Sequence, residues 1–361
     1  MTTPHSKDKP VIETWGRDTV RPGEERDVTI DVGESYLGAE ISIPAVVRRG
    51  PEPGPTLLLT AAVHGDELNG TGAIRQLIID PPVTLQRGAL ILAPVVNVFG
   101  FERHSRYMPD RRDLNRSFPG SADGSLTSRL AAGVFEQLVR RADYCIDLHT
   151  ASVRRVNFPN IRGDMKSPRV AELARAFGSE LIVSGRGPKG SLRRTACDHG
   201  VPTVILEAGE VWKVEPRVVE YTLRGVRSVL AHLGMTDEQP RTPAYRIETD
   251  ATKWVRALHG GFLRFHVAPG DFVDQHQPIA TNTSLIGKEQ NVIEAPREGV
   301  VLGMTTLPSV SPGDVICHLA FARERVLDRA VRAVDKLDDD SLHERIRQDL
   351  ARSVWVSTDD D

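Results

Sequence analysis

Residues 56–67 read TLLLTAAVHGDE, and this stretch decides the fold class of the chain. Its first part, Thr56–Val63, is a continuous apolar run, as expected for a central strand buried on both faces. His64 and Glu67 follow at once, and a helical pattern covers about 68–79. A strand that leads through a polar turn into a helix is typical of an open α/β sheet, where ligands bind at the carboxyl ends of the strands.

The same alternation of strand and helix continues to about residue 235. Residues 24–48 precede it and alternate apolar and polar positions, which favours antiparallel strands. Within the core at 56–235, we expect further strands at 89–96, 144–148, 180–183 and 203–206, and helices at 126–141, 168–177, 192–199 and 216–233. The sequence therefore predicts an α/β fold: a mixed, mostly parallel sheet sandwiched by helices.

The composition changes at 236–243, a polar linker that contains proline. Residues 244–322 carry many turns and little helical periodicity, which predicts a smaller C-terminal all-β domain. Residues 323–361 carry apolar positions at helical spacing and then an acidic tail. We therefore expect a catalytic domain at 1–238, followed by the β-rich domain and a C-terminal helix. Residues 1–20 read as a loose start.

Composition excludes several classes of protein. The 361 residues carry 46 Lys and Arg against 49 Asp and Glu, so no general attraction to nucleic acid or an anionic membrane is expected. No run of 18 apolar residues predicts a membrane span, and residues 1–20 lack the apolar run of a signal peptide. Three widely spaced cysteines favour reduced thiols. We expect a cytoplasmic protein without a nucleic-acid or membrane partner, which could form a homo-oligomer.

Three side chains at strand ends have the chemistry of a metal site. His64 and Glu67 lie three residues apart at a strand-to-helix turn, and His149 ends the expected strand at 144–148 in the same way. Two imidazoles and one carboxylate form the donor set of a catalytic zinc site with an open fourth position, so we expect one Zn²⁺ per chain. A single histidine at a strand end is usually a hydrogen-bonded structural residue, but the joint placement favours ligands. Asp147 either orients a histidine ligand or faces a neighbouring strand.

Glu207 directly follows the apolar strand at 203–206, where a carboxylate is costly unless it lines a cavity. Beside zinc it could take a proton from water and pass it to a leaving amine. A solvent-facing carboxylate is the alternative, which fits Glu210 better. Arg193 and Arg194 begin the helix ahead of this strand, and either could contact a second substrate carboxylate or lie on the surface.

The polar loop at 100–124 is rich in arginine. Arg116 could hold a carboxylate with two parallel hydrogen bonds, and Asn115 could add a neutral one. Arg106 could stabilise the oxyanion that develops when water attacks an amide carbonyl. A solvated basic loop is the alternative interpretation.

Five motifs together resemble the succinylglutamate desuccinylase/aspartoacylase family, a branch of the zinc carboxypeptidase fold. They occur in the family's order: HGDE at 64–67, PVVNVFGFERHSR at 94–106, DLNRSFPG at 113–120, DLH at 147–149 and LEAGE at 206–210. The resemblance implies a mixed eight-stranded sheet between helices, followed by a β-rich domain that shapes the site entrance. It also implies hydrolysis of the amide bond of N-acyl amino acids.

The resemblance carries residue roles as well. It implies zinc binding by His64, Glu67 and His149, general acid/base catalysis by Glu207, carbonyl polarisation by Arg106, and carboxylate binding by Asn115 and Arg116. Well-known members have a tyrosine ahead of the catalytic glutamate, whereas residues 190–199 (GSLRRTACDH) contain none. We therefore do not expect a succinyl- or N-acetylaspartate-type specificity.

Residues 260–301 resemble a biotinyl/lipoyl hammerhead. Lys288 lies at about the spacing of the modified lysine, but Gly287 and Glu289 replace the methionines expected beside it, so we expect a structural cap and not a carrier. The leading prediction is a zinc-dependent amidohydrolase that acts on a small N-acyl amino acid or similar amine. The alternatives are a metallocarboxypeptidase for short peptides and a non-catalytic carrier or scaffold protein.

Overall fold

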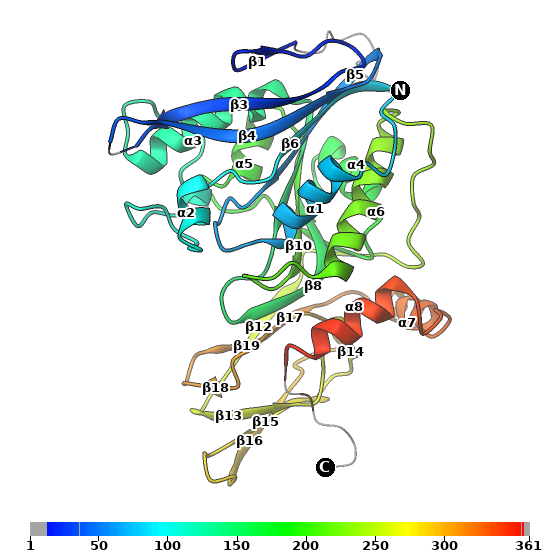
Figure 1. Cartoon of the computed structure of the whole chain (residues 1–361). Coiled ribbons are helices and arrows are strands. Elements are labelled where there is room, and N and C mark those ends of the chain that lie inside the picture. Colours follow the sequence, from blue (N-terminus) through cyan, green and yellow to red (C-terminus); the bar gives the residue numbers. More distant parts are fainter. Residues whose placement is uncertain (1–12, 36, 355, 357–361) are drawn as a thin grey trace.

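The computed structural model describes residues 13–35, 37–354 and 356. One mixed sheet forms the centre of the molecule (Figure 1), in the order β12-β19-β17-β8-β10-β7-β5-β6-β4-β3, with β9, β11 and β14 attached beside this path. The strands up to residue 209 are β1 (Thr14–Trp15), β2 (Asp18–Thr19), β3 (Glu25–Glu34), β4 (Glu40–Arg49), β5 (Glu52–Ala61), β6 (Arg87–Ala93), β7 (Tyr144–His149), β8 (Arg155–Gly163), β9 (Leu181–Ser184) and β10 (Thr203–Gly209).

The later strands are β11 (Ile247–Thr249), β12 (Thr252–Arg256), β13 (Gly261–Phe265), β14 (Phe272–Val273), β15 (Pro278–Thr283), β16 (Glu289–Glu294), β17 (Gly299–Thr305), β18 (Ser309–Val310) and β19 (Val315–Ala320). The helices are α1 (Asn69–Ile79), α2 (Val98–Glu102), α3 (Leu126–Gln137), α4 (Pro168–Ala176), α5 (Leu192–Asp198), α6 (Pro216–His232), α7 (Glu324–Val334) and α8 (Leu342–Ala351), with 3₁₀ turns at Leu114–Arg116 and Val139–Arg141.

The central strands run parallel, as predicted. β6, β5, β7 and β10 are parallel neighbours, while β4 and β8 flank them in antiparallel fashion. The family resemblance implies a mixed eight-stranded sheet, whereas the sheet here has thirteen strands, because β11, β12, β14, β17 and β19 extend β3, β4, β6, β5, β7, β10, β8 and β9. The expected α/β fold class is therefore confirmed, and the carboxyl ends of β5, β7 and β10 meet at one edge.

Alternate residues of β5 build two separate cores, one on each face of the sheet. Leu57 and Leu59 join the core that includes Ile74 of α1. Leu58 joins the core that includes Phe135 of α3. A strand that buries side chains on both faces reads as a continuous apolar run, which explains the TLLLTAAV pattern.

Strand β8 was not predicted from the sequence. Its stretch RVNFPNIRG contains Pro159, which cannot donate to a sheet ladder. On one edge, β8 pairs with β17 through residues 155–157 and with β9 through 161–163. Pro159 lies in the gap between these two neighbours, so no N–H group is required there. This arrangement lets a central strand contain a proline.

β8 also joins the sheet to the chain's C-terminal part (Figure 1), because β17, β19 and β12 continue the order beyond it. A second sheet, β16-β15-β13-β18, lies farther out, and Lys288 follows the β15–β16 turn. Helix α8 packs on α6 and β8. The division into domains at 238 and 244 stays a prediction, because backbone pairing and the core both run across it.

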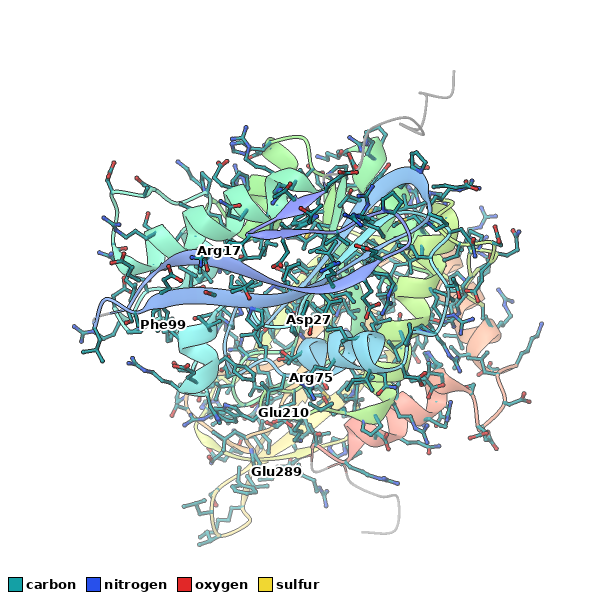
Figure 2. All side chains as sticks on the ribbon, turned by 45° about the horizontal axis from the view of Figure 1, so that its top comes forward. Arg17, Asp27, Arg75, Phe99, Glu210 and Glu289 are labelled. Atoms are coloured by element: carbon teal, nitrogen blue, oxygen red, sulfur yellow. The ribbon has the colours of Figure 1, made fainter. Side chains whose placement is uncertain are left out.

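The expectation of a loose start is wrong for residues 13–20. β1 and β2 form a short hairpin, and Trp15 is fully buried with the guanidinium of Arg141 over its ring at 4.0 Å. The rest of that start and the acidic end at 357–361 lie outside the described residues. Figure 2 shows the side chains as sticks over the whole ribbon, with Arg17 above Glu289 in this view. In the described part, no helix is long and apolar enough to span a bilayer.

Candidate metal centre and active site

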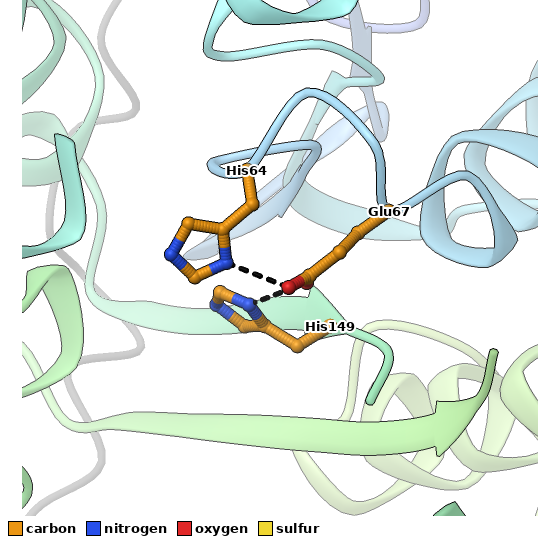
Figure 3. Close-up of side chains that lie close together, drawn as sticks. All are labelled: His64, Glu67 and His149. Carbon is orange, nitrogen blue, oxygen red and sulfur yellow. Dashed lines mark hydrogen bonds and ion pairs between the residues drawn. The ribbon is translucent and has the colours of Figure 1, made fainter. Parts of the chain in front are cut away.

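His64, Glu67 and His149 converge at the carboxyl edge of the sheet (Figure 3). Nδ1 of His64 lies 2.7 Å from Oε1 of Glu67, and Nδ1 of His149 lies 2.8 Å from Oε2 of the same carboxylate. The three side chains are almost fully buried, and one donor atom from each lies within 4.8 Å of the others. The structure therefore brings together the three residues that the sequence singled out as ligands.

A second carboxylate fixes each imidazole from behind. Nε2 of His149 lies 2.7 Å from Oδ2 of Asp147, whose other oxygen accepts a hydrogen bond from Oγ1 of Thr60 at 2.7 Å. Nε2 of His64 lies 3.2 Å from Oδ1 of Asp113. An N–H at Nε2 that donates to aspartate leaves the Nδ1 lone pair directed at Glu67. Both interpretations of Asp147 therefore hold, since it bonds the histidine and the neighbouring strand.

This geometry calls for a positive charge at the centre of the cluster. A lone pair on Nδ1 and a carboxylate oxygen at 2.7–2.8 Å repel one another unless a proton or a metal ion lies between them. In the protein without metal, burial opposes the charge on His149, but Asp147 and Glu67 outweigh it and raise its pKa well above the ordinary value. Burial likewise opposes ionisation of Glu67, yet the two histidines hold its pKa well below the usual range.

The turn that carries His64 is held by the neighbouring loop. The backbone N–H groups of Val96 and Asn97 donate to the carbonyls of Ala61 and Ala62. A Cβ atom on Gly65 would lie 1.9 Å from the carbonyl carbon of Gly100, so only glycine fits this close approach. The PVVNVFGFERHSR motif thus packs directly against the HGDE turn and positions its side chains.

Glu207 lies beside the cluster because its strand is the neighbour of β7. In the parallel pairing of β10 with β7, Glu207 is in register with His149. Registered residues on adjacent strands project from the same face of a sheet. Nδ2 of Asn157 donates to Oε2 of Glu207 at 3.0 Å, and a guanidinium nitrogen of Arg162 lies 4.0 Å from Oε1. The carboxylate is therefore oriented toward the same cavity as His149.

Glu210 has a different environment. It forms an ion pair with Lys213, and its Oε1 accepts a hydrogen bond from Oγ1 of Thr306 at 3.1 Å. It therefore joins the loop after β10 to the C-terminal part of the chain, while Glu207 lines the cavity.

A cavity of about 320 Å³ opens onto the cluster, and its charged walls are mostly cationic. Two carboxylates line it, those of Glu67 and Glu207. Five arginines line it as well: Arg106, Arg116, Arg155, Arg162 and Arg193. The protein groups at this site thus carry a surplus of positive charge even before a metal ion is counted.

Arg106 lies nearest to the cluster. Its guanidinium is 3.6 Å from Oε1 of Glu67 and donates to Oδ2 of Asp113 at 3.0 Å. Burial opposes ionisation of Asp113, but its hydrogen bond to His64 and the charge of Arg106 hold its pKa well below the usual range. The sequence motif contained Asp113, but sequence reasoning gave it no role.

Asn115 and Arg116 are positioned by contact with the loop ahead of α5. Oδ1 of Asn115 accepts from the backbone N–H of Leu192 at 2.9 Å, and Phe118 donates its N–H to the carbonyl of Gly190 at 3.0 Å. Arg116 donates to the carbonyl of Asn115 at 2.7 Å and still lines the cavity. Asn115 and Arg116 therefore both line the cavity that contains the cluster.

The two arginines at the start of α5 point to different places. Arg193 is only 8% exposed and lines the cavity, while Arg194 forms an ion pair with Asp198 and donates to the carbonyl of Gly187. Nη1 of Arg193 is buried without a hydrogen-bond partner among the described residues. Burial and the charge of Arg162 lower the pKa of Arg193 to about 10, so it stays protonated at neutral pH.

Among the cavity-lining residues that sequence reasoning missed are four large polar or aromatic side chains: Arg155, Asn157, Arg162 and Trp254. The first three belong to β8, whose polar side chains interrupt an otherwise apolar stretch. Polar residues inside a buried strand are a signal that could have found Asn157 and Arg162. Trp254 comes from β12, which begins almost 90 residues after the end of β8, and no local pattern connects it to the site.

The chain matches the model of the succinylglutamate desuccinylase/aspartoacylase catalytic domain over residues 53–233. It is 33% identical to the N-alpha-acetyl-L-2,4-diaminobutyric acid deacetylase of Halomonas elongata, over 80% of this chain and 87% of the relative. Among solved structures, it resembles a succinylglutamate desuccinylase/aspartoacylase from Rhodobacter sphaeroides with a TM-score of 0.70 at 26% identity, covering 83% of this chain and 95% of the other.

A product-bound structure of the ectoine utilization protein EutE (DoeB) from Ruegeria pomeroyi shares the fold, with a TM-score of 0.72 at 24% identity. The alignment covers 89% of this chain and all of the other. The family model matches half of the chain, and the deacetylase relative aligns with most of it. Both agree with the motifs that build the cluster of His64, Glu67 and His149. The chain therefore belongs to the succinylglutamate desuccinylase/aspartoacylase family and is a hydrolase of the deacylase type.

Proposed function

We propose that the protein is a zinc-dependent amidohydrolase that removes a small acyl group from an N-acyl amino acid. The observation that carries this proposal is the register of β10 with β7, which sets Glu207 beside His149. A carboxylate suited to proton transfer thereby faces the same cavity as three side chains suited to a metal ion.

The donor set fits zinc. Two neutral imidazoles and one carboxylate are the ligands of catalytic zinc sites, and each imidazole here has an aspartate behind it. His64, Glu67 and His149 would hold the ion. Zinc in such a site supplies Lewis acidity, which polarises a carbonyl oxygen and makes water more acidic.

The side chains around this site supply the other requirements of amide hydrolysis. Glu207 accepts a proton from the attacking water and returns it to the leaving amine nitrogen. Arg106 donates hydrogen bonds to the carbonyl oxygen as negative charge develops on it. Water adds to the acyl carbon and the C–N bond breaks, so that the products are a carboxylate and a free amino acid. Proton transfer to nitrogen is what lets the amine leave.

Arg116 and Asn115 hold the α-carboxylate of the substrate in this proposal. Arg116 offers paired N–H donors, and Asn115 has already used Oδ1 on Leu192, which leaves its Nδ2 as a donor. Arg193 is a second cation for the same purpose, and we prefer it to Arg194 because Arg193 lines the cavity.

The size of the cavity supports a small substrate. About 320 Å³ is at the lower end of the volumes of ligand cavities, which suits an acetylated amino acid better than a peptide. The relative in Halomonas elongata is named for the deacetylation of an acetylated diamino acid, which supports acetyl as the acyl group. Trp254 supports a role for residues 244–322 as a structural cap that shapes the entrance.

The test is release of free amine by the zinc-loaded protein, followed by mass spectrometry. The panel contains N-acetyl amino acids, among them N-α-acetyl-2,4-diaminobutyrate, together with N-succinyl amino acids and dipeptides. We expect hydrolysis of N-acyl amino acids that disappears with a chelator and returns with added zinc. Faster hydrolysis of the dipeptides would replace the proposal with a carboxypeptidase. No hydrolysis of any N-acyl amino acid would overturn it.

A further inference from the structure

A second cavity, of about 270 Å³, shares no lining residue with the active-site cavity. It lies where α8 packs beside α6 (Figure 1), next to the segment that leads into β11. Arg224 of α6 lines it, together with Glu180 ahead of β9 and Tyr245 ahead of β11. The turn between α7 and α8 closes it. The chemistry of this cavity is therefore separate from that of the proposed reaction.

The hydroxyl group of Tyr245 is buried at this cavity without a partner. Tyr245 lines the cavity and is only 7% exposed, and its hydroxyl oxygen has no hydrogen-bond partner in the described part of the chain. Burial and the charge of Glu180 raise the pKa of Tyr245 well above its ordinary value, so the hydroxyl keeps its proton and remains a donor. A buried hydroxyl that bonds nothing costs free energy, which favours a ligand that accepts from it.

Helix α8 begins at the same cavity. Ser341 is its N-cap, and the Ser341 hydroxyl accepts from the N–H of Glu344 at 3.2 Å. The N–H groups of Leu342 and His343 have no acceptor among the described residues, and both residues line the cavity. The first N–H groups of a helix project from its end and carry the partial positive charge of the helix dipole. They therefore attract an anion.

Arg345 adds a donor from the next turn of α8. Its Nη2 donates to Oε1 of Glu220 at 3.2 Å, whereas its Nε is buried with no hydrogen-bond partner in the residues that the structure describes. The unsatisfied groups at this cavity are thus all donors: a phenol hydroxyl, a guanidinium nitrogen and two backbone N–H groups. A ligand that satisfies them must offer acceptors in several directions.

The carboxylates that line the cavity leave no unpaired negative charge inside it. Glu180 is paired with Arg241 at 3.1 Å, and its other oxygen accepts a hydrogen bond from the hydroxyl of Tyr221 at 2.9 Å. The side chain of Asp340 is 96% exposed and lies 3.8 Å from Nε of Arg345. The free donors and the end of the helix therefore set the sign of the ligand that fits.

We propose that this cavity is a binding site for a small oxyanion, either a carboxylate or inorganic phosphate. The N–H groups at the start of α8, the hydroxyl of Tyr245 and Nε of Arg345 hold the anion. An oxyanion presents acceptor oxygens on several sides, which matches donors that come from separate segments. A bound anion also ties α8 to the segment ahead of β11, so its binding stabilises the fold.

The first test is thermal unfolding of the zinc-loaded protein, freed of excess zinc, in phosphate, acetate or chloride at equal ionic strength. Phosphate or acetate should raise the Tm by a few degrees above chloride, because the anion binds only the folded chain. Tyr245→Phe should lose most of this rise. In chloride, Tyr245→Phe should melt at the same temperature or higher, because it removes a buried hydroxyl that bonds nothing.

Tyr221→Phe is the matched control, because the hydroxyl of Tyr221 is also buried but bonds Glu180. It should lower the Tm in all three salts and keep the rise with the anion. Arg345→Met should lose the rise as Tyr245→Phe does. An anion bound in the active-site cavity gives a rise that both Tyr245→Phe and Arg345→Met retain. A full rise in these two variants would therefore overturn the proposal.

The second test reads the site itself by nuclear magnetic resonance. The chain has 11 histidines, so ¹⁵N-histidine labelling gives few amide signals, and His343→Gln assigns that of His343. Phosphate or acetate should shift this signal to saturation, and Tyr245→Phe should weaken the affinity about tenfold or more, because a hydrogen bond to a charged group is lost. The anion that binds more tightly identifies the ligand class. No saturable shift with either anion would overturn the site and assign the cavity to water.

Discussion

The two halves of the active-site cavity differ in how their polar groups are paired. In the half built by His64, Glu67 and His149, every side chain has a protein partner, and each imidazole is backed by an aspartate. In the other half, Arg155 and Arg193 face the cavity without an ion pair in the described residues.

This difference teaches how each half works. Backed imidazoles are fixed in place before a metal ion arrives, which favours strong binding of one small cation in one geometry. Unpaired guanidinium groups gain hydrogen bonds only when a ligand enters the cavity. The free-energy cost of burying them is therefore offset by ligand binding and not by folding. Substitutions in the first half should therefore remove metal or chemistry, while those in the second should change substrate binding and leave metal content alone.

The largest effect is expected for His149→Ala. Loss of one imidazole opens the metal site, so metal content should fall from about one ion per chain toward zero and turnover by more than about 10⁴-fold, because the Lewis acid is lost. Elemental analysis and initial rates measure both. His232→Ala, which alters a histidine paired with Glu172, is the control and should retain its metal. Full metal content in His149→Ala would show that His149 is not a metal ligand.

Glu207→Gln should keep the metal and lose the chemistry. Glutamine has nearly the same size but cannot accept the proton from water, so turnover should fall by roughly 10²- to 10⁴-fold. Glu210→Gln is the matched control, because Glu210 bonds Thr306 and Lys213 outside the cavity. Loss of metal from Glu207→Gln would make Glu207 a ligand, and unchanged turnover would assign proton transfer to another group.

Asp147→Asn tests the backing of the imidazole. The amide cannot hold the Nε2 N–H of His149 as strongly as the carboxylate does, so metal affinity should weaken by about 10- to 100-fold. Titration against a competing chelator measures it. The Asp147 carboxylate also binds Thr60, so the melting temperature of the metal-free protein needs to be recorded alongside. Unchanged affinity would mean that His149 is oriented without its aspartate.

The smallest effect is expected in the cationic half of the cavity, the half that contains Arg155 and Arg193. Arg193→Met should raise KM for an N-acyl amino acid by about tenfold and leave kcat and metal content nearly unchanged, because a charge-assisted hydrogen bond is worth about 1.5 kcal/mol. Removal of a buried, unpaired charge should hold or raise the melting temperature. Arg194→Met should change KM less than about twofold. Equal effects of the two substitutions would end the distinction drawn between them.

The sequence by itself determined the half of the cavity built by His64, Glu67 and His149 and the layers around it. One continuous apolar strand is followed by His64 and Glu67, and another strand ends at His149. The three side chains meet at one edge of the sheet because the two strands are parallel neighbours. This inference needs only the local strand and helix periods and the rule for where parallel strands end. Glu207 followed in the same way from its position at the end of a buried strand.

Only the tertiary structure decided which side chains line the cationic half of the cavity. Arg193 and Arg194 are neighbours in sequence, but successive residues of a helix point about 100° apart, and only the packing of α5 decided which one lines the cavity. Trp254 reaches the site because β12 continues the sheet through β19 and β17 to β8. β8 was not predicted because it contains Pro159, and a proline normally argues against a central strand. Only the fold shows that Pro159 lies in the gap between the two neighbouring strands β17 and β9. Contacts between segments far apart in the chain depend on strand order and helix rotation, which no local sequence pattern encodes.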